Sequence, residues 1–255
     1  MDALLDIATI LPVLFFIIAF AYSSVGLGGG SSYTALMLIV GMNTLTIPLV
    51  SLSLNLFVTT IGSFNFIRKK HVKLKILLPF IITSIPMSYL GGSLKLPTDI
   101  FYFILLFSLL FTVFRLYFWK TTTLNLSLNS KTKIIVSLVA GSIFGFIAGT
   151  VGIGGGIYLI PLIIILGLGN QKEAAACGVI FIWLNSAAGI ISRLQYNAVD
   201  LSQYTPLIIA VIIGGALGSH MGATHFSTKT MEKILGVIVI VAIFVLTKNL
   251  IGIYF

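Results

Sequence analysis

The chain has 255 residues, of which 58% are hydrophobic and 8% are charged. A mean hydropathy of +1.14 excludes a soluble globular protein and indicates an integral membrane protein with no separate soluble domain. The formal net charge of +9 comes from lysines and arginines in short loops beside apolar segments, so it indicates membrane orientation and not nucleic-acid binding. Cys177 is the single cysteine, which excludes an intrachain disulfide.

Apolar segments long enough to cross about 30 Å of hydrocarbon recur along the chain, and we predict an all-α integral membrane protein with about eight spans. The predicted spans are residues 4–24, 43–67, 76–94, 99–119, 134–151, 172–193, 203–222 and 228–249. Two further apolar segments, residues 31–41 and 157–168, are too short to cross the membrane and are predicted to be half-helices.

Each half-helix follows a cluster of four glycines, in VGLGGGSS at residues 25–32 and in VGIGGGIY at residues 151–158. Glycine costs about 1 kcal/mol relative to alanine inside a helix, so each cluster predicts a helix break. The half-helices then begin near Ser31 and Ile157, and each directs a partial positive charge and free N–H groups toward its break. Two such ends close together predict an anion site.

The glycine clusters belong to a longer internal repeat, since the second cluster starts 126 positions after the first, from 26 to 152. Two similar halves are predicted at residues 4–119 and 134–249, joined by a polar linker at 120–133, within a single transmembrane domain of residues 1–255. Further matches pair Asn55 with Asn185, Pro79 with Pro206 and Gly91 with Gly218.

The charges of two loops bear on the orientation of the halves. The sequence RKKHVKLK at residues 68–75 contrasts with its counterpart RLQYNAVDLSQ at residues 193–203, which has one base and one acid. The positive-inside rule places the first loop in the cytoplasm and the second outside, which favours inverted repeats. Parallel repeats, with eight simple spans and both termini inside, also satisfy the rule, so the charges favour inversion only weakly.

Polar residues inside apolar segments are the remaining candidates for the site. Asn55 and Asn185 lie deep in spans where lipid offers no hydrogen bond, so each either lines the substrate path or bonds a neighbouring helix. No Lys or Arg lies in mid-span, so an anion must be held by backbone N–H groups, half-helix dipoles and neutral side chains. The predicted substrate-binding residues are Gly26, Gly28, Gly29, Gly30, Ser31, Ser32, Asn55, Gly152, Gly154, Gly155, Gly156, Ile157 and Asn185.

The sequence has no mid-span carboxylate, no histidine pair with metal-ligand spacing and no Ser-His arrangement, so we expect no metal, no cofactor and no catalytic site. We therefore expect a secondary transporter in which one half rocks against the other around the glycine breaks. An anion channel and a non-catalytic membrane subunit are the alternatives.

The duplicated glycine motif, VGLGGGSS in the first half and VGIGGGIYLIPLI in the second, resembles that of the sulfite exporter TauE/SafE family. The likeness covers nearly the whole chain, and the second motif, with Pro161, matches better than the first, which has Ala35 at the equivalent place. The resemblance implies a multi-pass transporter that moves sulfite, sulfonates or related organic anions across the bacterial inner membrane. Its expected partners are the small anionic substrate and the lipid bilayer, with the oligomeric state left open.

Overall fold

The computed structural model describes residues 2–117, 128–196, 199–224 and 236–248, apart from residues 238 and 245. All regular elements in this part of the chain are helices, which confirms the predicted all-α class. They are α1 Asp2–Ser24, α2 Gly30–Ile39, α3 Ile47–Arg68, α4 Leu74–Ser93, α5 Thr98–Tyr117, α6 Ser130–Val151, α7 Gly156–Ile165, α8 Gln171–Arg193, the short 3-10 helix η1 Leu201–Tyr204, and α9 Thr205–Thr224. Further helical residues lie between 236 and 248.

Five helices among the described residues are long and apolar enough to cross a membrane. They are Ile47–Arg68, Leu74–Ser93, Ser130–Val151, Gln171–Arg193 and Leu201–Met221. Shorter apolar helices are Ile10–Ser24, Thr98–Phe114, Gly156–Ile165 and Val239–Lys248. The span count of about eight stays a prediction, because much of the last predicted span, 228–249, and most of the linker 120–133 lie outside the described residues.

Both glycine clusters form tight turns that end one helix and begin a short one. The first turn separates α1 from α2, with φ of +80° at Gly26 and +98° at Gly29. The second separates α6 from α7, with φ of +84° at Gly152, +80° at Gly154 and +75° at Gly155. Residues with a side chain rarely adopt this left-handed conformation, so the glycines are what allows both breaks.

Each short helix folds back along the helix that precedes it. The Tyr33 ring of α2 stacks on Phe15 of α1, with ring centres 5.1 Å apart. The Tyr158 ring of α7 lies 5.3 Å from the Phe144 ring of α6. Both aromatic partners lie about two turns before the end of the long helix, so α1 with α2 and α6 with α7 form two helical hairpins.

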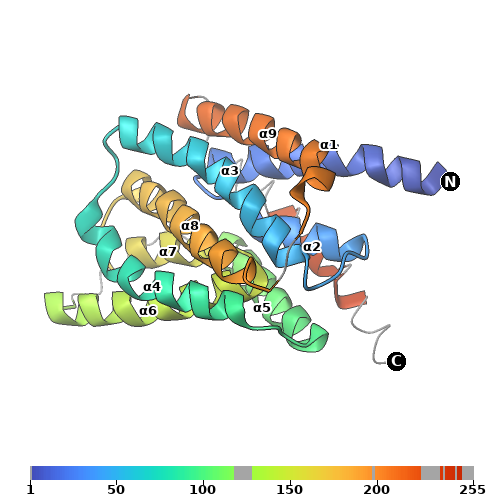
Figure 1. The fold of residues 1–255 in the computed structure, drawn as a ribbon. Coiled ribbons are helices and arrows are strands. Elements are labelled where there is room, and N and C mark those ends of the chain that lie inside the picture. The colour runs from blue at the N-terminus through green and yellow to red at the C-terminus, as the bar shows by residue number, and fades with distance from the viewer. Residues whose placement is uncertain are drawn as a thin grey trace.

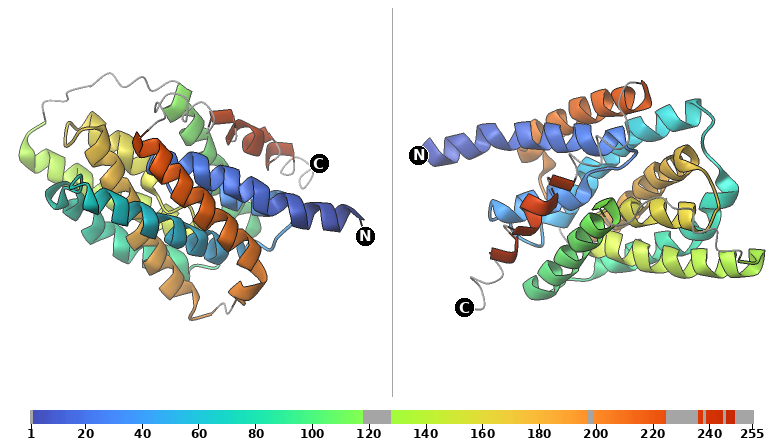
Figure 2. Two further views of the ribbon diagram at one scale, coloured as in Figure 1. Left: turned by 90° about the horizontal axis from the view of Figure 1, so that it is seen from above. Right: turned by 180° about the vertical axis from the view of Figure 1, so that it is seen from behind.

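The helices form three layers in Figure 1, with α1 and α9 on one side, α3 and α8 in the middle, and α4 and α6 on the other side. Figure 2 shows the same α1–α9 pair from above and from behind. Small residues set this packing: a Cβ on Gly141, Gly145 or Gly149 of α6 would collide with the α4 backbone, and a Cβ on Gly214 or Gly218 of α9 would collide with the α1 backbone. The α4–α6 pair and the α9–α1 pair therefore repeat one arrangement, with partners exchanged between the two halves.

Replacing Gly145 by alanine should destabilise the protein by about 1–3 kcal/mol, because the added methyl group pushes α6 away from the Ser84 backbone, whose Cα would lie 2.6 Å from it. Thermal unfolding of the purified protein in detergent measures this. Val139→Ala is the control on the same helix, since the Val139 side chain is 54% exposed and packs against little protein. An unchanged unfolding temperature for Gly145→Ala would contradict the close helix contact.

Candidate functional site

The two glycine turns meet at the hydroxyl of Ser51, a buried residue of α3. The Ser51 Oγ lies 2.8 Å from the carbonyl oxygen of Gly152 and 3.2 Å from that of Gly30, so it bridges the second turn and the first. The Thr34 hydroxyl of α2 donates a hydrogen bond to Ser51 Oγ at 3.0 Å. The Gly152 carbonyl, which follows the end of α6 and has no helical partner, is thus met by a side chain from the first half.

Asn55, one helical turn after Ser51, lies between the two turns. Its side chain is fully buried, and Nδ2 donates a long hydrogen bond of 3.4 Å to the Gly152 carbonyl. A Cβ on Gly28 would lie 2.6 Å from Asn55 Oδ1, and a Cβ on Gly154 would lie 3.2 Å from Nδ2. Asn55 Oδ1 has no hydrogen-bond partner in the structure. The amide therefore brings a weakly engaged donor and a free acceptor to the point where the hairpins meet.

Both short helices begin without a side-chain cap. Their N-cap residues are Gly29 and Gly155, and neither helix has a side-chain hydrogen bond at its start. The helices α3 and α4 also begin without a side-chain cap, whereas Asn129 and Asn170 cap the first N–H groups of α6 and α8. The first N–H groups of α2 and α7 lack this compensation, and the positive end of each helix dipole points into protein at the site.

The other predicted residues of the short helices lie at the turns without offering free side chains. The Ser31 and Ser32 hydroxyls hydrogen-bond with the Tyr22 hydroxyl of α1, at 3.0 and 2.7 Å. Gly30 and Gly156 start the two short helices, and Ile157 follows as a buried apolar residue. The serines therefore tie α2 to α1, and their backbone N–H groups are what they bring to the turn.

Asn185 occupies a different position from Asn55, and the pairing of these two asparagines was wrong by three residues. A Cβ on Gly28 or on Gly154 would contact both Asn55 and Ile182, so these two side chains hold equivalent places in the halves. Two neighbouring contacts give the same offset of 127: Gly26 faces Ala175 as Gly152 faces Pro48, and Gly62 faces Val179 as Gly189 faces Leu52.

The Asn185 side chain points toward α4. Its Nδ2 donates to Ser84 Oγ at 3.1 Å and to the Phe181 carbonyl at 2.8 Å, and its Oδ1 has no partner. Asn185 lies almost one helical turn beyond Ile182, which rotates it away from the glycine turns. The structure thus supports the interhelical hydrogen bond for Asn185, which was one of the two readings left open by the sequence.

The polar side chains at the site come from one half only. At the offset of 126 between the glycine turns and of 127 between α3 and α8, the counterparts of Thr34, Ser51 and Asn55 are Ile160, Gly178 and Ile182. A Cβ on Gly178 would lie 2.7 Å from Ile160, much as Ser51 contacts Thr34 in the other half. The first half lines the meeting point with hydrogen-bonding groups and the second half with hydrocarbon.

Arg193 is a basic side chain buried at the end of an apolar helix, so the prediction that no Lys or Arg lies in mid-span is not contradicted by it. It ends α8 but is only 2% exposed, and its Nη2 donates to the carbonyls of Gly149 and Thr150 at 2.9 and 2.7 Å. Nη1 lies 3.4 Å from the Tyr196 hydroxyl, which itself donates to the Gly92 carbonyl. Arg193 thus neutralises the negative end of α6 directly before the second turn.

Sequence reasoning missed Arg193 because its acceptors lie more than 40 residues earlier in the chain. Its position at the end of an apolar helix also suits an ordinary charge at the membrane surface.

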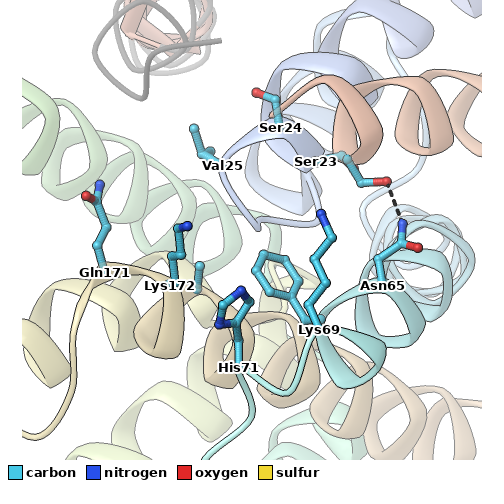
Figure 3. A pocket seen from close by; sticks show the side chains of 11 residues that line it. Ser23, Ser24, Val25, Asn65, Lys69, His71, Gln171 and Lys172 are labelled. Atoms are coloured by element: carbon cyan, nitrogen blue, oxygen red, sulfur yellow. Dashed lines mark hydrogen bonds between the residues drawn. The ribbon is translucent and has the colours of Figure 1, made fainter. Parts of the chain in front are cut away.

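A pocket of about 240 Å³ lies next to the first turn and is lined by the start of α8, whereas Arg193 lies at the other end of that helix. Figure 3 shows Lys69, His71 and Lys172 around it, below the end of α1 at Ser23, Ser24 and Val25. Among the described residues no group of three or more His, Cys, Asp or Glu is placed to hold a metal ion.

Ser51→Ala should lower the free energy of unfolding by about 1–3 kcal/mol, because it leaves the Gly30 and Gly152 carbonyls buried without their shared donor. Ser53→Ala is the matched control: Ser53 is also buried on α3, but its hydroxyl bonds only the Leu49 carbonyl of its own helix. Thermal unfolding of both purified variants decides the point. Equal losses would mean that Ser51 does not join the hairpins.

The sequence matches the family described as Sulfite exporter TauE/SafE over residues 11–246. A "Probable membrane transporter protein y4hK" of Sinorhizobium fredii is 32% identical over 236 residues, covering 91% of this chain and 95% of the relative. A "Probable membrane transporter protein" of Xylella fastidiosa (strain Temecula1) is 25% identical, over 88% of this chain and 89% of the relative. No solved structure matches the chain. The chain therefore belongs to the TauE/SafE family and is a multi-pass membrane protein of a transporter family.

Proposed function

We propose that the protein is a secondary transporter that exports sulfite, organosulfonates or related small anions, and that it binds them where the two glycine turns meet. The convergence of two uncapped helix starts on the Asn55 amide carries this proposal. Backbone N–H groups and two helix dipoles favour negative charge there without a buried cation in direct contact. Arg193 adds positive charge behind the second turn, across the last residues of α6.

The Asn55 side chain suits an oxyanion that carries one acidic hydrogen. Its Nδ2 donates to an anion oxygen, while the unpartnered Oδ1 accepts the hydrogen of a species such as hydrogen sulfite. Because the hydrogen bond from Nδ2 to the Gly152 carbonyl is long, turning the amide toward a ligand costs little free energy. Export agrees with the family's description, and an anion that leaves a negative interior gains about 2.3 kcal/mol per charge and 100 mV.

Inverted repeats, about 4–119 and 134–249, are the topology we propose. In Figure 1 the first residues of α1 lie at the right and those of α6 at the left, although these helices open the two halves. The α3–α4 connection with Lys69, Lys70 and Lys73 lies at the opposite end of the molecule from the α8–α9 connection. The positive-inside rule then assigns the first connection to the cytoplasm.

Alternating access is supported by a difference between the two faces. At the register of 127 residues, Phe66 and Lys69 beside the pocket correspond to Arg193 and Tyr196 on the other face. Those two side chains are bonded to the ends of α6 and α4, so they fill the place where the pocket's counterpart would lie. An open first face and a closed second face fit one end state of a rocking transporter.

Asn55→Ala should raise the KM for transport of sulfite or a sulfonate at least about tenfold, because a hydrogen bond to a charged ligand contributes about 1.5–3 kcal/mol. Uptake of labelled anion into liposomes containing the purified protein measures it. Asn185→Ala is the control, which should lower the unfolding temperature but keep KM, since its amide bonds α4. Unsaturable flux that carries large currents would instead indicate a channel.

Inversion is tested with single cysteines at Val72 and Val199, each in a Cys177→Ala background. We expect a membrane-impermeant thiol reagent to label Val72→Cys only from the cytoplasmic side and Val199→Cys only from the opposite side. Both sites lie in connections at opposite ends of the bundle. Labelling of both cysteines from the same side would contradict inverted repeats and restore the parallel arrangement.

A further inference from the structure

We propose that the pocket beside the first turn is a second anion site, which holds a small sulfonate or other oxyanion at the mouth of the transport path. That the pocket lies on the transport path rests on the proposed function. That the pocket binds an anion is argued from its lining residues alone. The pocket is bounded by the end of α1, the end of α3, the start of α8 and Ser219 of α9.

The ionisable side chains that line the pocket are all basic. Lys69, His71 and Lys172 line it, and no lining residue is acidic. The nearest acid in sequence, Glu173, is engaged elsewhere: it pairs with Lys73 at 3.7 Å and accepts the Asn170 N–H at 3.0 Å. In Figure 3 the Lys69 and Lys172 side chains both point toward the end of α1, which concentrates positive potential inside the hollow.

The inner wall of the pocket is neutral and already hydrogen-bonded. Ser23 and Ser219 are 6% and 8% exposed, their hydroxyls donate to the Gly215 and Ala216 carbonyls, and Asn65 Nδ2 donates to Ser219 Oγ at 3.2 Å. The volume of about 240 Å³ equals roughly eight water molecules, enough for a sulfonate group with a few waters. Lys69 and Lys172 around a hollow with room for several waters suit a partly hydrated anion.

The floor of the pocket adjoins the first glycine turn. Val25 lines the pocket and directly precedes Gly26, and Ala175, another lining residue, has its Cβ 2.9 Å from where a Cβ on Gly26 would lie. An anion in the pocket is therefore separated from the first turn by little more than the backbone at Gly26. This proximity distinguishes the pocket from an ordinary basic surface loop.

A purely structural role for Lys69 and Lys172 makes a different prediction about the access of anions to the pocket. Lys69 and Lys172 near the last turn of α1 also offset the negative end of its dipole, and lysines in this loop orient the membrane insertion. Either role needs positive charge only in the neighbourhood, and neither requires that a dissolved anion reach the end of α1. Access of charged reagents to this position separates the two explanations.

The test uses the full chain with Cys177→Ala and Ser24→Cys, because Ser24 lines the pocket. The rates of thiol modification by the anionic reagent 2-sulfonatoethyl methanethiosulfonate and by its trimethylammonium analogue are measured at low salt, each relative to free cysteine. We expect the anionic reagent to be favoured, and the preference to fall by about tenfold when Lys69→Gln and Lys172→Gln are combined. Sulfate should slow the anionic reagent in the chain with both lysines.

Lys75→Gln is the matched control, since Lys75 belongs to the same basic segment but does not line the pocket, and it should change the preference less than about twofold. Equal preferences in the lysine double variant and its parent, or no protection by sulfate, would overturn the anion site. The outcome is independent of transport: a protein that moves no sulfite or sulfonate fails the proposed function, while the labelling ratio still decides whether the pocket binds anions.

Discussion

The cost of an interrupted helix in a medium without water is the constraint on which the rest of this structure depends. Backbone groups left unpaired in hydrocarbon cost several kcal/mol each, so a break survives only where other parts of the protein meet them. Here Ser51 serves the carbonyls of both turns, and Arg193 serves two carbonyls at the end of α6. Each hairpin is thus completed by groups from outside it, which explains why the halves interlock and do not simply sit side by side.

Some hydrogen-bonding groups at the glycine turns are left without side-chain partners, and these groups bear on the proposed function. The Gly30 and Gly152 carbonyls have side-chain partners, whereas the starts of α2 and α7 have no side-chain cap and Asn55 Oδ1 has no partner. Donors and one acceptor left over at a single buried point are costly for an empty protein. In the anion site that we propose, a ligand that satisfies these groups would recover that cost, so the imbalance that weakens the unliganded fold would contribute to binding.

The sequence predicted the breaks and the half-helices because glycine density reports backbone conformation directly, as the positive φ angles at Gly29 and Gly155 show, whereas the anion site between them stays a prediction. It did not predict the register of α3 against α8. Two asparagines in similar surroundings suggested a match, yet a difference of three residues turns Asn185 toward α4. Contacts between distant segments, such as that of Arg193 with α6, leave no local pattern in composition or periodicity.

The bonds made by Arg193 have no counterpart in the first half, where Phe66 stands at the equivalent position. Two identical inverted halves would exchange conformations and yield end states of equal free energy. In this chain a guanidinium bonds helix carbonyls at one face, whereas the equivalent position at the other face, Phe66, carries a hydrocarbon ring that forms no such bond. In the alternating-access cycle that we propose, this difference biases the carrier before any gradient is applied: the empty protein would rest open to the basic face, where Lys69 and Lys172 line the proposed second anion site.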